Sequence, residues 1–216
     1  AREHGFSKDD MDRFALQSQQ LAAAATEAGH FAHEIVPIEI TLPEGGTALH
    51  TVDEGIRFDA SLASIAQVKL MSEDGRLTAA SSSQICDGAA AMLVVSGAGL
   101  KQLGVEPLAR VHHLSVRGAD PVNLLEAPLP VTARALKKAG MKIDDIDLYE
   151  VNEAFASVPL AWLRYLHADP PRLNVHGGAI ALGHPLGASG ARIMTTLIHA
   201  LRTRGKRWGL QRMCEG

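Results

Sequence analysis

The sequence predicts a layered α/β fold for the second part of the chain. From about residue 84 onward, short apolar runs typical of buried strands alternate with segments of helical periodicity. Such alternation is typical of helices packed on the faces of a sheet. The 216 residues, of which 46% are hydrophobic, suffice for one large domain or two small ones.

Composition excludes several classes of protein. The formal net charge is −3, which argues against a general nucleic-acid binder. No apolar run approaches the ~20 residues that span a bilayer, and the first residues lack the apolar core of a signal peptide. Cys86 and Cys214 are far apart, which excludes a disulfide scaffold and a cysteine-based zinc site. We therefore expect a cytoplasmic protein with no metal, membrane or nucleic-acid partner.

The first part of the chain is predicted to be irregular after one long helix. Ser7 and Asp10 form a capping-box pattern at its start, and Gly29 suits its end. The expected elements are a helix over 9–28, a strand over 33–40, a loop over 41–60, a short helix over 61–70 and a polar stretch to residue 83.

The second part is predicted to alternate regularly, after a boundary within residues 84–106. The expected strands cover 89–95, 108–117, 146–150, 173–175 and 207–213. The expected helices cover 97–103, 130–139, 154–167 and 189–204. Residues 89–95 form a continuous run of small apolar side chains, the pattern of a strand covered on both faces.

The sharpest motif is a glycine-rich loop between a strand and a helix, spanning residues 174–190. Its glycines permit close backbone approach, and its amides at a helix N-terminus can hold an anion or an oxyanion. It matches neither a Walker A loop nor a dinucleotide-binding fingerprint. Because the backbone around His184 would aim its ring, this histidine is a candidate catalytic group rather than a solvated one.

Two further sites have competing interpretations. Asn152, after a predicted strand, is either the N-cap of the next helix or an amide that donates a hydrogen bond at the strand end. Cys214 is either a small buried side chain or a reactive thiol near His184. For Cys86, packing is the favoured role.

Together the motifs resemble those of the thiolases, the acetyl-CoA acyltransferases. The matching segments are Asn-Glu-Ala-Phe-Ala at 152–156, Gly-Gly-Ala-Ile-Ala-Leu-Gly-His-Pro at 177–185, Gly-Ala-Ser-Gly at 187–190 and Cys-Glu-Gly at 214–216. Asp-Gly-Ala-Ala-Ala at 87–91, after Ser-Ser-Ser-Gln, is similar to a thiolase segment, and residues 53–57 look like part of its loop domain.

The resemblance implies a role for each matching residue. His184 would activate the acyl-accepting cysteine and donate to the thioester oxyanion, and Asn152 would fix a water in that oxyanion hole. Cys214 would be the acid and base at the α-carbon of acetyl-CoA, with the Gly216 amide in a second oxyanion hole. Ser83 would touch the pantetheine arm of CoA. Arg57 lies in the region that meets the CoA nucleotide, with a looser match.

The resemblance also implies a layered αβαβα fold that is incomplete, because the N-terminal half with the nucleophilic cysteine is absent. Cys86 does not replace it. The expected parts are a loop domain (1–85), the end of the N-terminal thiolase domain (86–105) and a C-terminal domain (106–216) cut at its last strand. Residues 1–85 would face CoA rather than form core.

The implied activity is thiolysis of 3-ketoacyl-CoA in lipid degradation, or the reverse Claisen condensation, with CoA and acyl-CoA as substrates and no permanently bound cofactor. Residues 124–127 are bulkier than the glycine-containing segment of biosynthetic thiolases, which the resemblance places close to the acyl pocket, so a degradative thiolase with an unusual acyl substrate is compatible with the sequence. A homodimer or tetramer is expected of the complete protein, and an inactive portion of this chain alone. Two alternatives are a related condensing enzyme and a non-thiolytic CoA-binding protein.

Overall fold

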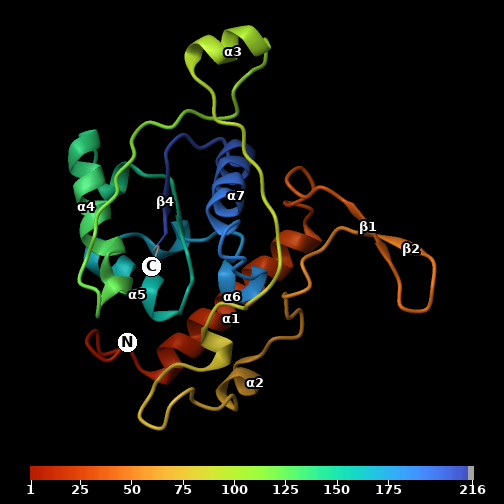
Figure 1. Ribbon diagram of the computed structural model, residues 1–216. Coiled ribbons are helices and arrows are strands. Elements are labelled where there is room, and N and C mark those ends of the chain that lie inside the picture. The colour runs from red at the N-terminus through yellow and green to blue at the C-terminus, as the bar shows by residue number, and fades with distance from the viewer. Residues whose placement is uncertain (214–216) are drawn as a thin grey trace.

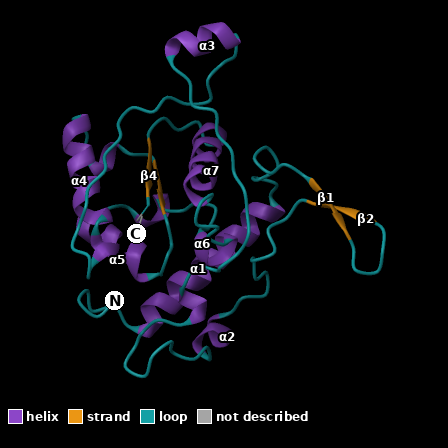
Figure 2. Cartoon of the chain, in the orientation of Figure 1, coloured by secondary structure: helices purple, strands orange, loops and turns teal. Residues whose placement is uncertain are grey.

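The computed structural model describes residues 1–213, in which helices and short strands are joined by long connections (Figures 1 and 2). The helices are α1 (Lys8–Glu27), α2 (Leu62–Ala66), α3 (Gly97–Leu103), α4 (Pro128–Ala139), α5 (Ser157–Leu166), α6 (Ala179–Leu182) and α7 (Ser189–Thr203). The strands are β1 (Ile38–Thr41), β2 (Thr47–His50), β3 (Leu148–Val151) and β4 (Gly209–Arg212).

Strand β3 lies at the centre of the fold and is buried along its whole length. It pairs in parallel with β4, and Leu173 forms a parallel bridge to Tyr149 of β3. Successive side chains of a strand point to opposite faces. Leu148 accordingly packs against Leu197 of α7, whereas the Tyr149 ring lies 5.2 Å from that of Trp162 in α5. Helices thus cover both faces of β3, which confirms the predicted layered α/β class.

Helix α1 is the predicted long helix, and it belongs to the core. Ser7 accepts a hydrogen bond from the Asp10 amide while the Asp10 carboxylate accepts one from the Ser7 amide, so the capping box is confirmed. Met11 and Phe14 are buried in the same apolar cluster as side chains of β3 and α5. The expectation that residues 1–85 lie outside the core is therefore wrong for α1.

The predicted strand over 33–40 is displaced and belongs to a hairpin. Residues 28–34 form turns, and β1 begins only at Ile38. It pairs antiparallel with β2 around Gly45 and Gly46, whose φ angles of 91° and 87° suit glycine. The hairpin extends away from the body of the molecule (Figure 1). The sequence Ile-Glu-Ile-Thr of β1 alternates apolar and polar residues, which predicts a strand, but both faces of β1 are exposed, so the alternation does not mark a buried face.

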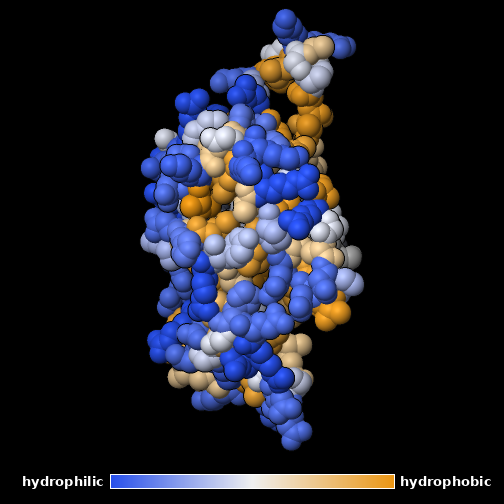
Figure 3. All heavy atoms as spheres, turned by 90° about the vertical axis from the view of Figure 1, so that its left-hand side faces the viewer, coloured by the Kyte–Doolittle hydropathy of each residue, from blue (hydrophilic) through white to orange (hydrophobic). Residues whose placement is uncertain are grey.

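Two predicted strands, 89–95 and 108–117, are absent from the described structure. Both segments lack regular structure and connect to α3, which itself forms as predicted. They leave large apolar side chains exposed, such as Val94 (76%) and Val116 (92%). Hydrophobic atoms accordingly follow the chain up to α3 (Figure 3). The physical reason is that a strand is stabilised by neighbouring strands, and none of the described residues pairs with these two segments.

No helix in the described part of the chain combines the length and the apolar character needed to cross a membrane. Within residues 1–213, no three His, Cys, Asp or Glu side chains gather in a way that could hold a metal ion.

His176 joins the turn after α1 to the central layer. Its ring is 4% exposed, stacks on His30 at 4.8 Å between centroids and meets the edge of Phe31 at 5.8 Å. Its Nδ1 atom has no hydrogen-bond partner among the described residues. Burial, together with the positive charges of His30 and Arg204, lowers the pKa of His176 to about 4. The ring therefore stays neutral in the folded chain at pH values where an unfolded chain protonates it.

This pKa shift predicts a loss of stability in mild acid. Below an unfolded pKa of about 6.5 the unfolded chain binds a proton that the folded chain does not, so stability falls as the pH drops toward 4. His176→Asn should flatten this slope, with a difference on the order of 2 kcal/mol near pH 4. Urea unfolding between pH 4 and 8 measures it.

His113→Gln, at an exposed position, serves as the control and should keep the slope of the unchanged chain. Identical pH slopes for all three proteins would contradict the assignment of the effect to His176.

Candidate active site

His184 lies in the connection between α6 and α7, and the backbone around it is fixed. The φ angle of Gly183 is 84°, and a Cβ atom there would lie 2.4 Å from Cys86 Sγ, so only glycine fits. The His184 amide donates to the Gln84 carbonyl at 2.9 Å. The sequence predicts a loop whose backbone orients His184, and the structure contains such a loop.

A buried serine sets the proton position on His184. Ser189 Oγ donates to the Pro185 carbonyl at 3.1 Å and lies 2.6 Å from His184 Nδ1. A hydroxyl has a single proton, so Ser189 must accept the Nδ1 proton. In the neutral ring Nε2 is then unprotonated, and this nitrogen is the one that can act as a base. The sequence analysis gave Ser189 no role of its own, although it belongs to the Gly-Ala-Ser-Gly motif at 187–190.

Asn152 lies directly after β3 and contacts His184. Its Nδ2 atom is 3.3 Å from His184 Nε2, and its backbone amide donates to the Arg212 carbonyl at 3.0 Å. Helix α5 begins at Ser157 with Ala156 as its N-cap, so the capping interpretation of Asn152 is wrong. Asn152 Oδ1 is buried and has no hydrogen-bond partner among the described residues, which leaves the amide one unused acceptor.

Glu153 is a buried carboxylate to which the sequence analysis gave no role, although it lies in the motif at 152–156. It accepts hydrogen bonds from Ser18 Oγ at 2.7 Å, Asn174 Nδ2 at 2.8 Å and the Ile180 amide at 3.1 Å. Burial raises the pKa of Glu153, and the hydrogen bonds from Ser18, Asn174 and Ile180 act in the opposite direction. The donors come from α1, the segment after Leu173 and α6, so Glu153 joins three elements beside Asn152. The sequence did hint at this buried acid, because Glu153 lies between a buried strand and an apolar helix.

Ser83 lies against the junction that follows β3. Its amide donates to the Ala154 carbonyl at 3.0 Å, and its neighbour Ser82 forms an antiparallel bridge with Phe155. Through Gln84 the same segment reaches the backbone of His184. The structure therefore places the backbone of Ser83 beside the elements that hold Asn152 and His184.

Cys214 and Gly216 lie outside the described residues. Strand β4 ends at Arg212, the register partner of Val151, one residue before Asn152. The interpretation of Cys214 as a reactive thiol near His184 therefore stays a prediction.

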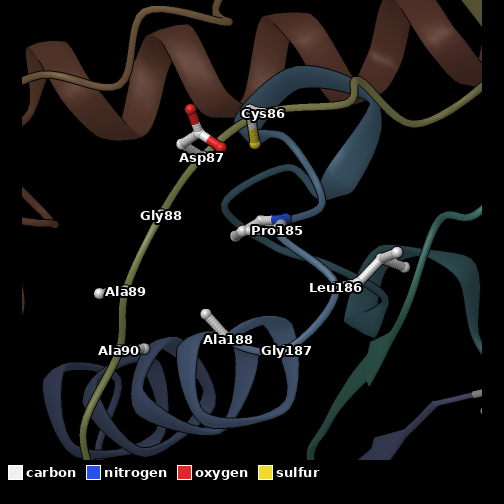
Figure 4. Close-up of a pocket in the computed structure, with 9 residues that line it drawn as sticks. All are labelled: Cys86, Asp87, Gly88, Ala89, Ala90, Pro185, Leu186, Gly187 and Ala188. Carbon is white, nitrogen blue, oxygen red and sulfur yellow. The ribbon is translucent and has the colours of Figure 1, made fainter.

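Cys86 lines an open pocket of about 450 Å³ between residues 86–90 and 185–188 (Figure 4). The thiol is exposed, so the packing role expected for Cys86 is limited to its contact with Gly183. His184, Asn152 and Ser83 do not line this pocket.

The arrangement supports proton transfer next to a hydrogen-bond donor. His184 Nε2 can take a proton from a nearby acid and then present it as an N–H donor to a developing oxyanion. The Asn152 amide lies within reach of the same atom. Ser189 holds the ring in the tautomer that this role needs.

The fit between Gly178 and Glu153 predicts a sharp steric effect. A Cβ atom at Gly178 would lie 2.3 Å from the Glu153 carboxyl carbon. Gly178→Ala must therefore displace a carboxylate that three donors hold, and we expect destabilisation of about 2 kcal/mol or more in urea unfolding.

The matched control is Gly187→Ala in the same loop, where a Cβ atom meets nothing within 4 Å. This variant should stay within about 0.5 kcal/mol of the unchanged chain. Equal stability of the two alanine variants would contradict the prediction.

Family models match both parts of the chain. The model for "Thiolase, N-terminal domain" matches residues 1–98, and the model for "Thiolase, C-terminal domain" matches residues 105–216.

Curated relatives match along the whole chain. A steroid 3-ketoacyl-CoA thiolase of Mycobacterium tuberculosis is 50% identical over 216 residues, which are 100% of this chain and 52% of the relative. An acetyl-CoA acetyltransferase of Synechocystis is 46% identical, over 100% of this chain and 54% of the relative. The chain thus spans about half the length of the curated relatives it matches.

Solved structures agree with these matches. The Bacillus anthracis acetyl-CoA acetyltransferase superposes with a TM-score of 0.94 at 36% identity, over 100% of this chain and 55% of its own. The human mitochondrial 3-ketoacyl-CoA thiolase in complex with CoA gives a TM-score of 0.88 at 38% identity, over 100% of this chain and 54% of its own. With its His184 loop and Asn152 junction in place, the chain belongs to the thiolase family.

Proposed function

We propose that this chain supplies one side of a thiolase active site, in an enzyme that cleaves 3-ketoacyl-CoA with CoA into acetyl-CoA and a shortened acyl-CoA. The observation that supports it most directly is the double contact of His184. Nδ1 is held by Ser189, and Nε2 faces Asn152. The arrangement suits a base that becomes a donor to an oxyanion.

In this proposal the first half-reaction forms a thioester on a cysteine thiol from the part of the fold that the relatives add. His184 Nε2 takes the proton of that thiol, and the sulfur attacks the 3-keto carbon. The bond between the α-carbon and that carbon breaks, and its electron pair passes to acetyl-CoA as an enolate. Cys214 then donates a proton to the α-carbon, and the Gly216 amide is proposed as part of the second oxyanion hole.

The second half-reaction transfers the acyl group to CoA. The Cys214 thiolate left by the first half-reaction takes the proton of the CoA thiol, whose sulfur attacks the thioester carbon. The bond between that carbon and the enzyme cysteine breaks, and the leaving cysteine takes its proton back from His184. The oxyanion formed in this step accepts hydrogen bonds from His184 Nε2–H and from a water held by Asn152. Run in reverse, the sequence is the Claisen condensation.

CoA and acyl-CoA are the proposed substrates, with no permanently bound cofactor. The human relative at a TM-score of 0.88 is a complex with CoA, which supports a CoA site in this fold. Ser83, whose backbone lies at the same junction as Asn152, is the proposed contact to pantetheine. A degradative role with a bulky acyl group fits the 50% identical steroid thiolase.

The remaining expectations are also proposals. We propose a homodimer or tetramer for the complete protein, in the cytoplasm. Residues 1–85 are proposed as a loop domain, 86–105 as the end of the N-terminal domain and 106–216 as the C-terminal domain.

A second candidate is a thiolase-like protein that binds CoA without turnover. A measurement of turnover distinguishes the two proposals. A protein that only binds CoA would show no thiolysis, even with the remaining part of the fold added.

The 216-residue chain alone should show no thiolysis, because the acyl-accepting cysteine belongs to the other part of the fold. The measurement is loss of acetoacetyl-CoA absorbance with CoA present, for the chain alone and with the N-terminal part of a relative added. We expect activity, and less aggregation, only with the added part, since exposed apolar segments then become covered. Full activity of the chain alone would point to Cys86 as the nucleophile and sink this proposal.

Ser189→Ala should slow the reconstituted enzyme by about tenfold or more in kcat, because the Nδ1 proton loses its acceptor and the ring loses its tautomer preference. The KM for CoA should change little. Ser72→Ala, at an exposed position, is the control. A kcat of Ser189→Ala equal to that of the control would show that Ser189 does not orient His184.

A further inference from the structure

Two glutamine side chains converge on the end of α6, directly before His184. Gln84 Nε2 donates to the Ile180 carbonyl at 2.8 Å and to the Ala181 carbonyl at 3.3 Å. Gln19 Nε2, from the buried face of α1, donates to the same Ile180 carbonyl at 3.2 Å. The last carbonyls of a helix lack partners within it, so these amides cap a helix of only four residues.

The same two side chains also hold residues 55–57. Gln84 Nε2 donates to the Gly55 carbonyl at 2.8 Å, and Gln19 Oε1 accepts from the Arg57 amide at 2.7 Å. A Cβ atom at Gly55 would lie 2.7 Å from the Ala181 carbonyl oxygen. The segment can therefore pack directly against α6 only because residue 55 is glycine.

Gln84 reaches His184 through its backbone as well. Its carbonyl accepts from the His184 amide at 2.9 Å, and its amide donates to the Ala179 carbonyl at 3.4 Å. One residue thus contacts both ends of α6, the backbone of His184 and the segment at Gly55.

We propose that Gln19 and Gln84 form a glutamine clamp that positions His184 relative to residues 55–57, and that both are positioning residues for the reaction. The inference rests on the proposed function, with residues 55–57 taken as part of the segment that meets CoA. The clamp couples a shift of residues 55–57 on CoA binding to the His184 loop. The imidazole depends on this placement, because its contacts to Asn152 and Ser189 are 3.3 Å and 2.6 Å long.

The chemistry of the amide explains why glutamine is needed. At Gln19 one group must donate to a carbonyl and accept from an amide, which neither a carboxylate nor an apolar side chain can do. Truncation of either side chain leaves buried backbone groups without hydrogen-bond partners, which destabilises the structure locally. Gln19 and Gln84 both contact the Ile180 carbonyl and residues 55–57, so the effects of substituting them should not be additive.

The first test is hydrogen exchange of the chain with Gln19→Ala, Gln84→Ala, both together, and the control Gln20→Ala, an exposed neighbour on α1. Each clamp variant should raise exchange in residues 53–57 and 179–186 together, by about tenfold, while β3 and α5 keep their protection. The double variant should show less than the sum of the two logarithmic effects. Exchange that rises in one segment only, or equally throughout the chain, would overturn the clamp.

The second test uses the reconstituted enzyme and separates positioning from a loss of folded protein. A merely unfolded fraction lowers kcat and leaves KM unchanged, whereas the clamp variants should lower kcat by about tenfold and also raise the KM for CoA. An unchanged KM for CoA would overturn the coupling. If the unsubstituted protein shows no turnover, the proposed function fails, and the exchange experiment still decides on the clamp.

Discussion

The buried carboxylate of Glu153 is the constraint on which the rest of the site depends. A carboxylate without partners in the interior would cost several kcal/mol, so Glu153 is tolerable only when its three donors are in place together. These donors belong to Ser18, Asn174 and Ile180, which are distant in sequence. The position of α6, and with it the start of the His184 loop, is therefore tied to α1 and β3. Gly178 belongs to the same constraint, because any side chain there would occupy the space of the carboxylate.

Local signals in the sequence predicted the elements that local chemistry determines. The capping box at Ser7, the central buried strand and the helix over 97–103 all form close to their predicted bounds. The segments 89–95 and 108–117 have the composition of strands but no partner strand within residues 1–213, and pairing over long distances is not encoded in either segment alone. Residues 173–175 contribute a bridge rather than a strand for a related reason, since only Leu173 meets β3 in register.

The candidate site was predictable where a motif concentrates unusual residues, and only there. A histidine between glycines drew attention to His184, and its contact with Asn152 agrees with that interpretation. Glu153 and Gln84 escaped because their importance comes from partners more than 20 residues away, such as Ser18 for the first and Gly55 for the second. Both residues lie in motifs of the sequence, but a single sequence does not show which distant groups they contact, and glutamate and glutamine are common on surfaces.

The contacts that orient His184 come from other parts of the chain than the exposed segments around α3. Residues 84, 152 and 189 each contact His184, and none of the three belongs to the exposed segments around α3. Those segments leave apolar side chains such as Val94 and Val116 in contact with water. Covering them would stabilise the fold through burial of apolar surface without changing the contacts of His184 to these three residues. In the proposed reaction, the rest of the fold would thus contribute stability and the nucleophile, while residues of this chain orient His184.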